Sequence, residues 1–296
     1  MAIPAFLAYL SLEKKYSPLT IVAYKGDLED FARFCLEEYQ TSALEKVEYA
    51  IIRNWIVQMS NAQISNRSIN RKISALRAYY NFLLKIGEIR ISPLARHRSL
   101  KTPKKVEIPF SESEMETVLR QIPFDDNFEG TRDRLIIELL YATGIRRSEL
   151  VNLKMNRIDL STKTIKVVGK RNKERIVPLL DSTADFLAAY IEERNGLVYR
   201  ADNAYLFLLK SGNKIYETLV YRIINKYFSL VSPKVKKSPH ILRHTFATHM
   251  LNKGADLNSV KELLGHSSLA STQVYTHTSI AELKRVHGAS HPRSKK

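Results

Sequence analysis

The sequence predicts a mainly helical protein with a small antiparallel β-sheet, divided into two domains. Through most of the chain, apolar residues recur every three or four positions, which is the period of an amphipathic helix. One stretch, residues 164–178, alternates apolar and polar residues around a polar turn, as a β-hairpin does. A basic, proline-containing stretch at 98–109 has neither period and is typical of a linker.

The first domain, residues 1–100, is expected to be entirely helical. Ser17 is a candidate N-cap and Pro18 a candidate first helical residue, because proline lacks the N–H group that would be unpaired there. A later helix is expected to begin near residue 65 and to stop at Gly87. The apolar stripes of these two helices are Leu28, Phe31, Phe34 and Cys35, and Ile69, Ile73, Leu76, Tyr80 and Leu83.

The charge of the first domain is uneven. Residues 1–50 hold five basic and eight acidic side chains, whereas residues 51–105 hold twelve and one. Solvated faces usually mix both signs, so the near absence of acids favours a surface for a polyanion, although a plain solvated face stays open as the alternative. The candidate binding residues are Arg67, Arg71, Lys72, Arg77, Lys101, Lys104 and Lys105.

The linker proper is placed at 101–109, and the second domain at 110–296. Ser111 and Glu114 have the spacing of a capping box, which predicts a helix to about Gln121. A further helix is expected to end at Gly144, because glycine favours the left-handed conformation that closes helices. The hairpin follows, and the rest of the domain is expected to return to helix. The second domain is therefore predicted to be α+β.

Composition limits the classes of function. The chain has 296 residues, 44% of them hydrophobic, and a net charge of +17, which favours a polyanionic partner, nucleic acid first and an acidic membrane surface second. The single cysteine, Cys35, excludes an internal disulfide and a cysteine metal site, and suits a reducing compartment. The first residues lack a basic leader and a cleavage site, and no apolar run is long enough to span a membrane. We therefore expect a soluble, cytoplasmic protein without membrane association.

Several basic side chains could act together on a phosphodiester. Arginines bind both non-bridging oxygens, histidine adds a hydrogen-bond donor, lysine can protonate a leaving oxygen, and tyrosine can attack phosphorus. No group of acidic or histidine residues has the spacing of a metal site, so no cofactor is expected. The candidates are Arg146, Lys170, His240, Arg243, His266 and Tyr275.

Each candidate taken alone has an ordinary structural explanation. Most of the fifteen tyrosines are expected to serve packing or surface, and basic residues in so basic a chain are usually solvated. His244 and His249 share the predicted helix of His240, so periodicity does not decide which histidine acts. Spacing and composition alone indicate a basic, mostly helical protein that binds phosphate groups.

The order of five motifs resembles that of a known family. The segments "TGIRRSEL", "VVGKRNKERIVPL", "HILRHTFATHM", "LLGHSS" and "VYTH" are similar in order and spacing to those of the tyrosine recombinases, also called the phage-integrase family. The family's catalytic positions match Arg146, Lys170, His240, Arg243, His266 and the nucleophile Tyr275. Glu149 matches an acidic residue that supports the site structurally, whereas Arg147 is a departure, because an apolar or small residue is common there.

The resemblance covers nearly the whole chain and implies a mechanism. The first domain is similar to the family's core-binding domain, a helical unit that with the catalytic domain forms a clamp around double-stranded DNA. Tyr275 would attack a DNA phosphate and form a 3′-phosphotyrosine without metal or ATP, Lys170 would protonate the departing 5′-oxygen, and His240 would accept the tyrosine proton. Exchange with a second DNA strand would then reverse the reaction.

The ending "HGASHPRSKK" is similar to that of the Xer recombinases, which resolve chromosome dimers. This branch implies a short inverted-repeat site, a tetramer of one recombinase or of two paralogues, and a septal DNA translocase as activator. The tail, residues 278–296, is expected to dock on a neighbouring protomer, with folding back on its own domain as the alternative. An integrase of a mobile element is the main alternative function. A type IB topoisomerase and a catalytically silent DNA-binding protein are less favoured.

Overall fold

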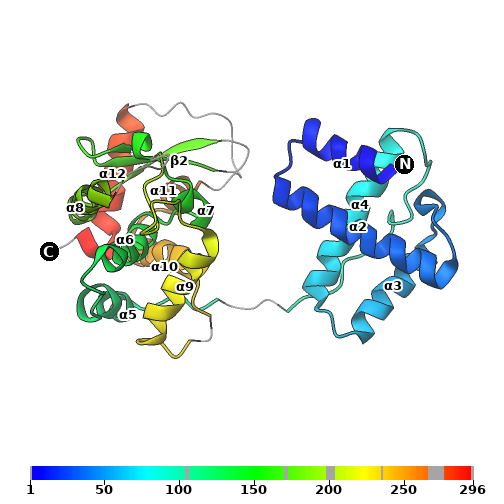
Figure 1. The fold of residues 1–296 in the computed structure, drawn as a ribbon, viewed down its shortest axis with the longest axis horizontal. Helices are drawn as coiled ribbons and strands as arrows, with labels where there is room; N and C mark the ends of the chain where they lie inside the picture. The colour runs from blue at the N-terminus through cyan, green and yellow to red at the C-terminus, as the bar shows by residue number, and fades with distance from the viewer. Residues whose placement is uncertain are drawn as a thin grey trace. The chain divides into compact units, whose positions relative to one another are not determined.

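The chain forms two compact units, residues 1–105 and 106–296. The structure is a computed structural model, and it describes residues 2–103, 107–169, 173–197, 204–234, 236–265 and 277–294. The predicted fold class is confirmed, because helices predominate and the sheet is small and antiparallel (Figure 1).

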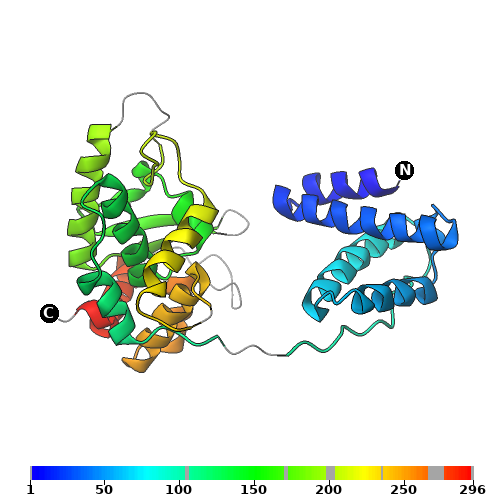
Figure 2. The same cartoon turned by 60° about the horizontal axis from the view of Figure 1, so that its bottom comes forward.

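The first unit consists of helices around one apolar core. Ser17 accepts a hydrogen bond from the Thr20 N–H, and Pro18 begins the next helix, as predicted. Both predicted apolar stripes are buried, and they pack with Phe6 and Trp55. Figure 2 shows α1 and α2 side by side. The helices are α1 (Ala2–Leu12), α2 (Pro18–Tyr39), α3 (Tyr49–Asn61) and α4 (Asn66–Lys85), with a 3-10 turn at Leu44–Lys46.

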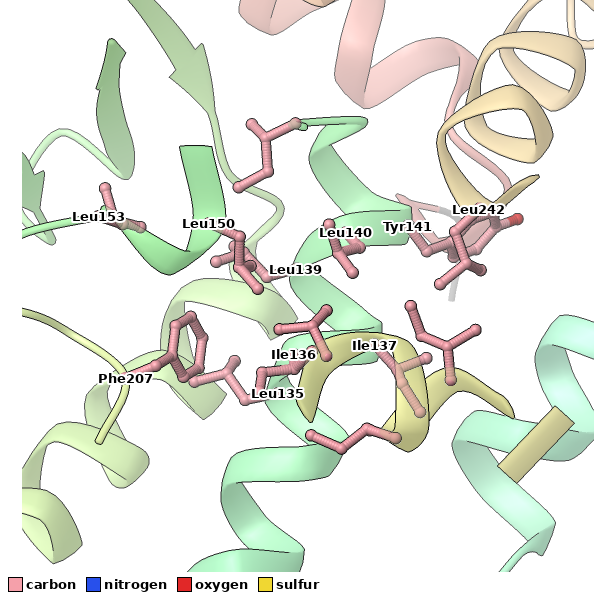
Figure 3. Close-up of a cluster of buried hydrophobic side chains, with 14 of the residues drawn as sticks. Leu135, Ile136, Ile137, Leu139, Leu140, Tyr141, Leu150, Leu153, Phe207 and Leu242 are labelled. Carbon is pink, nitrogen blue, oxygen red and sulfur yellow. The ribbon is translucent and has the colours of Figure 1, made fainter. Parts of the chain in front are cut away.

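The second unit is built around α6 (Phe128–Thr143), which is buried along most of its length. Its leucines and isoleucines meet side chains from the following segments, among them Leu150, Phe207 and Leu242 (Figure 3). The helix ends at Gly144, which has a φ of +61°. A side chain there would also collide with Phe246, so the glycine is required both by the backbone and by packing.

The sheet of the second unit has the order β1-β2-β3, with antiparallel pairing throughout. The predicted hairpin is present, and Ile165 faces Val177 in its register. The short strand β1 was not predicted, because two residues are too few to display a period. The strands are β1 (Ile158–Asp159), β2 (Thr164–Val168) and β3 (Glu174–Pro178).

The remaining helices surround α6 and the sheet. The predicted capping box is confirmed, and the helical segment that it begins ends at Gln121 as expected, although its second part, Thr117–Gln121, is π-helical. The helices are α5 (Glu112–Glu116), α7 (Arg147–Val151), α8 (Asp181–Leu197), α9 (Glu217–Ser229), α10 (Pro239–Asn252), α11 (Leu257–Leu264) and α12 (His277–Ser290), and short 3-10 turns lie at Met155–Arg157 and Pro292–Ser294.

The C-terminal helix α12 packs on its own domain in this chain, against β3, α10 and α11. Leu283 is buried there, and the rings of two histidines reach the last turn of α6. His287 Nε2 donates to the Ala142 carbonyl at 2.6 Å, and His291 Nε2 to the Tyr141 carbonyl at 3.2 Å. Burial lowers the pKa of His291 to about 3, so the ring is neutral at pH 7.

Candidate active site

A buried glutamate of the second unit binds two arginines, one of which is the predicted catalytic residue Arg146. Both carboxylate oxygens of Glu149 accept hydrogen bonds from Arg175, at 2.8 and 2.9 Å. Arg146 donates to the same carboxylate through its backbone N–H at 2.7 Å and through Nη1 at 2.8 Å. The Glu149 side chain is only 2% exposed. Burial opposes its ionisation, but the hydrogen bonds and charges of the two arginines outweigh this and lower its pKa.

Local structure explains why Arg146 and Glu149 meet. Gly144 ends α6, the chain turns, and Arg146 becomes the residue that caps α7. Glu149 is the third residue of α7, where a glutamate side chain can reach back to the backbone of the capping residue. The two side chains therefore pair because one turn places both at the start of the same helix.

Three arginines bind three consecutive carbonyls where α11 ends. Arg175 Nε donates to the Leu263 carbonyl at 2.9 Å, Arg243 Nη2 to that of Leu264 at 2.7 Å, and Arg146 Nη2 to that of Gly265 at 3.1 Å. A helix C-terminus carries partial negative charge and unpaired carbonyls, so it is a favourable place for cations. The end of α11 and the Glu149 carboxylate together hold the guanidinium groups in fixed positions.

Arg243 is the most buried of the predicted catalytic residues that the structure describes. Besides the Leu264 carbonyl, it donates to the Gly144 carbonyl at 2.6 Å. Burial, together with the positive charges of Arg146 and Arg175, lowers its pKa to about 10, although the Glu149 carboxylate opposes this shift. Arg243 is still charged at pH 7. Because Arg146 and Arg243 donate to the adjacent carbonyls of Gly265 and Leu264, the two predicted phosphate-binding arginines belong to one cluster.

Three predicted catalytic residues, Lys170, His266 and Tyr275, lie outside the described residues. The residue before Lys170 is described, and it lies at the cluster, because a Cβ atom on Gly169 would be 3.3 Å from Glu149 Oε1 and 3.7 Å from Arg146 Nη1. The residue before His266 is Gly265, whose carbonyl accepts from Arg146. The chain therefore reaches the arginine cluster immediately before both positions.

The three histidines of α10 have different surroundings. His240 is 75% exposed, and its Nε2 lies 3.3 Å from an oxygen of Glu107. His244 is exposed one turn further on. His249 is buried and hydrogen-bonded to the Tyr141 hydroxyl at 2.9 Å, which gives it a structural role in the core. The structure thus separates His249 from the two exposed histidines, which periodicity could not do.

Comparison with known proteins identifies the family. The phage integrase family model matches residues 112–282, and the model of the phage integrase N-terminal SAM-like domain matches residues 3–87. The chain belongs to the phage integrase family. It is 41% identical to the protein named tyrosine recombinase XerC of Anoxybacillus flavithermus, over 98% of this chain and 97% of that one, and 38% identical to the one of Chlorobaculum parvum, over 97% and 93%. The resemblance to the Xer recombinases is confirmed.

Solved structures of recombinases share the fold. The XerH site-specific recombinase bound to palindromic difH substrate, in a post-cleavage complex, aligns with a TM-score of 0.70 over 96% of this chain and 93% of that one. At 20% sequence identity this similarity concerns the fold alone. It extends over both units of the integrase-family chain.

The predicted DNA-binding residues of the first unit differ in their surroundings. Arg71 forms a bidentate ion pair with Asp27, and Lys72 pairs with Asp27 at 3.2 Å and Asp30 at 2.7 Å. Their charges are thus balanced within the domain. Arg77 donates to the carbonyl of His97 at 3.2 Å. Arg67 and Lys101 are exposed, whereas Lys104 and Lys105 lie outside the described residues.

Arg175 is the member of the cluster that sequence reasoning missed. It is 5% exposed and contacts both Glu149 and the end of α11. The signal was its place in the hairpin, since Arg175 is two residues before the buried Val177 and so faces inward on the same strand. A charged residue at an inward position calls for a buried partner of opposite charge.

Arg147 pairs with Glu217, the first residue of α9. The unusual cation beside Arg146 therefore has an ion-pair partner of its own. Within the described ranges, no three acidic, histidine or cysteine side chains gather as metal ligands would. Within the same ranges, none of the helices has the length and hydrophobicity needed to cross a membrane.

Proposed function

We propose that the protein is a site-specific DNA recombinase that cleaves and rejoins strands through a 3′-phosphotyrosine intermediate, with Tyr275 as the nucleophile. The observation that carries the proposal is the fixed arrangement of Arg146 and Arg243, which Glu149, Arg175 and the end of α11 support. Cationic donors that are already oriented stabilise the charge that develops on phosphate oxygens. The names of the relatives, tyrosine recombinase XerC, support the same activity.

In this mechanism the oxygen of Tyr275 forms a bond to phosphorus, and the bond from phosphorus to the 5′-oxygen breaks. Arg146 and Arg243 bind the non-bridging oxygens, and His266 completes the pocket. His240 accepts the tyrosine proton, and Lys170 donates a proton to the departing 5′-oxygen. Because the phosphotyrosine conserves the bond energy, a 5′-hydroxyl from a second strand then reverses the reaction without ATP.

The biological role follows from the Xer-like relatives. We propose that the protein acts in the cytoplasm on double-stranded DNA, at a short inverted-repeat site bound by two protomers, and resolves chromosome dimers. The synaptic assembly is a tetramer, alone or with a paralogue, and a septal DNA translocase is the proposed activator. The tail 278–296 is proposed to contact a neighbouring protomer at synapsis, which would require α12 to leave β3, α10 and α11.

We divide the chain functionally into a core-binding domain at 1–100, a linker at 101–109 and a catalytic domain at 110–296. The proposed polyanion surface comprises Arg67 of the first domain, together with Lys101, Lys104 and Lys105 of the linker. Arg71, Lys72 and Arg77 stay candidates, but DNA phosphates would compete for them with the partners they have in this structure.

A trapping experiment tests the proposed function. In DNA duplexes nicked close to the cleavage point, attack frees a short fragment that carries the 5′-hydroxyl needed for rejoining. This fragment dissociates, so the phosphotyrosine adduct accumulates and can be detected in the presence of SDS. The wild-type protein should form this adduct, whereas Tyr275→Phe should form none and bind DNA with nearly unchanged affinity, because only the nucleophilic oxygen is lost. An adduct with Tyr275→Phe would show that another residue attacks.

A further inference from the structure

A carboxylate lies beside the histidine that is proposed to accept the tyrosine proton. Glu107 is the first residue of the second unit that the structure describes. Its two carboxylate oxygens face two different basic side chains. Oε1 accepts from Lys236 Nζ at 3.1 Å, and Oε2 lies 3.3 Å from His240 Nε2. The Glu107 side chain is 28% exposed, whereas those of Lys236 and His240 are 53% and 75% exposed.

The surroundings of Glu107 are positively charged. His244 lies one turn beyond His240 on the same face of α10, and its charge also acts on the carboxylate. The hydrogen bond from Lys236 holds the pKa of Glu107 below its usual range, with His240 and His244 adding to the effect, so the carboxylate is ionised at neutral pH. Lys236 and His240 flank the residue that caps α10, Ser238, and the positive end of a helix adds to the attraction for an anion.

We propose that Lys236 and His240 form a binding position for one DNA phosphate, and that Glu107 occupies this position in the DNA-free protein. DNA must then displace the carboxylate before His240 can act. This inference rests on the proposed function, and it adds to it one phosphate-binding residue, Lys236, and one internal competitor, Glu107.

The physical basis is the similarity between the two anions. A carboxylate and a phosphodiester each present two oxygens to hydrogen-bond donors, and both suit a lysine ammonium and a histidine ring N–H at these distances. They cannot share the position, since two negative charges in contact repel each other. In the wild-type protein, DNA that binds at Lys236 therefore displaces the Glu107 carboxylate. In a protein without this carboxylate, the same binding step would release salt ions instead.

The test is Glu107→Gln, measured against a matched control. Glu116→Gln removes the same charge from the same unit, where Glu116 pairs with Arg120 at 3.4 Å on the exposed face of another segment. A short duplex of random sequence serves as the probe, because phosphate contacts do not depend on sequence. The affinity is measured over a series of salt concentrations.

We expect Glu107→Gln to bind the duplex about 3- to 10-fold more tightly than the wild type at low salt, with a steeper dependence of log K on log salt, by about one unit. Glu116→Gln should leave both quantities close to those of the wild type. Unchanged or weaker binding by Glu107→Gln would overturn the proposal. So would an equal gain with Glu116→Gln, because the effect would then be one of net charge.

A double-mutant cycle tests whether the gain acts through Lys236. In a Lys236→Met background, Glu107→Gln should give less than a third of its gain in affinity, because no cation is left at the shared position. A full gain in that background would contradict the assignment. On nicked duplexes, Glu107→Gln should form the covalent adduct at least as fast as the wild type. A several-fold slower reaction would contradict the proposal, because Glu107 would then assist His240 in the reaction and not compete with DNA.

The two proposals can fail separately. If the wild-type protein forms no adduct on any nicked duplex, the proposed recombinase function fails, whereas the affinity measurements need no chemistry and still report on Glu107. If the adduct forms but the affinities of the two glutamine variants agree, the function stands and the inference about Glu107 fails.

Discussion

At the scale of single residues, the site is held together by an excess of positive charge around one buried carboxylate. Glu149 faces Arg146 and Arg175 directly, and Arg243 lies near enough for its pKa to respond to all three. Three cations against one anion would repel each other without further partners. The carbonyls at the end of α11 supply those partners, and a bound phosphate would further reduce the excess positive charge.

Arg175 should matter first for stability. In Arg175→Met, Glu149 keeps only Arg146, and the loss of one partner from a buried ion pair costs about 3–5 kcal/mol of the free energy of unfolding. Urea unfolding measures this. Arg175→Lys should recover only part of the loss, since an ammonium group does not bind both carboxylate oxygens in one plane. A change below about 1 kcal/mol in Arg175→Met would mean that water replaces the arginine.

A substrate whose leaving group needs no proton can test whether Lys170 donates a proton or only positions the DNA. If this lysine protonates the leaving 5′-oxygen, Lys170→Ala should cleave an ordinary phosphodiester poorly but should be rescued by a 5′-bridging phosphorothiolate, whose sulfur leaves without a proton. The rates of covalent adduct formation on the two substrates measure this. Arg146→Ala is the control. It should lose about 10²-fold on both substrates, because it removes an oriented donor and no proton. Equal defects in Lys170→Ala would leave this lysine a positioning role and make Lys173 the next candidate.

At the scale of elements, the ends of the helices and of the hairpin position the residues of the candidate site. The end of α6 supplies the turn into α7, the end of α11 supplies the carbonyls that bind the arginines, and the hairpin brings Gly169 to Glu149. The last turn of α6 also accepts the two buried histidines from α12. The C-terminal helix is therefore attached to the same helix that leads to the candidate active site.

This attachment predicts a loss of stability in mild acid. The folded pKa of His291 is about 3, below the usual value near 6.5 of an unfolded histidine, so the unfolded chain binds more protons as the pH falls below about 6.5. Stability contributed by this group is complete above that pH, and between pH 7 and pH 5 about 2 kcal/mol of the free energy of unfolding should be lost.

Thermal unfolding of His291→Phe against the wild type measures this contribution. The phenylalanine keeps an aromatic ring beside Tyr141 and Phe246 but does not titrate, so the variant should lose less stability between pH 7 and pH 5. His244→Gln, a change at an exposed histidine, should keep the wild-type dependence on pH. If His291→Phe and the wild type lose the same amount, His291 is not the group that titrates.

At the scale of the whole molecule, each unit has a core of its own. One buried cluster joins α1 to α4 within residues 1–105, and two others lie in the second unit, one around α6 and one between α10, α11 and α12. The first unit carries the net positive charge of residues 51–105, and the second carries the arginine cluster. If both units bind DNA at once, the linker makes the second binding event intramolecular, so the combined affinity would exceed that of either unit alone.

Cutting the linker tests this division. A protease site placed at 101–103 should give two fragments that each unfold cooperatively, because neither core depends on the other. The cut mixture should bind DNA at least about 10²-fold more weakly than the intact chain, since the tether no longer raises the local concentration of the second unit. The uncut chain with the same inserted site is the control. Equal affinity after cutting would show that one unit carries all of the binding.

The sequence by itself determined the features that depend on local order along the chain. The caps at Ser17 and Ser111, the end of α6 at Gly144, the hairpin and the buried stripes of α2 and α4 all follow from spacing within a few residues. The family also followed from the sequence, because the order of its motifs is written along the chain. Composition and spacing alone would have stopped at a basic, helical protein that binds phosphate groups.

Only the tertiary structure decided which distant residues meet. Arg175 reaches Glu149 across 26 positions, and Arg146 reaches Gly265 across 119, and neither contact leaves a periodic trace. In the structure, Arg71 and Lys72 form ion pairs with Asp27, and His249 is buried beside Tyr141. Glu107 lies beside His240. The physical reason is that the electrostatic interactions of a charged group depend on its neighbours in space. A count of charges along the sequence therefore predicts that the protein binds an anion, but not which cations are left to bind it.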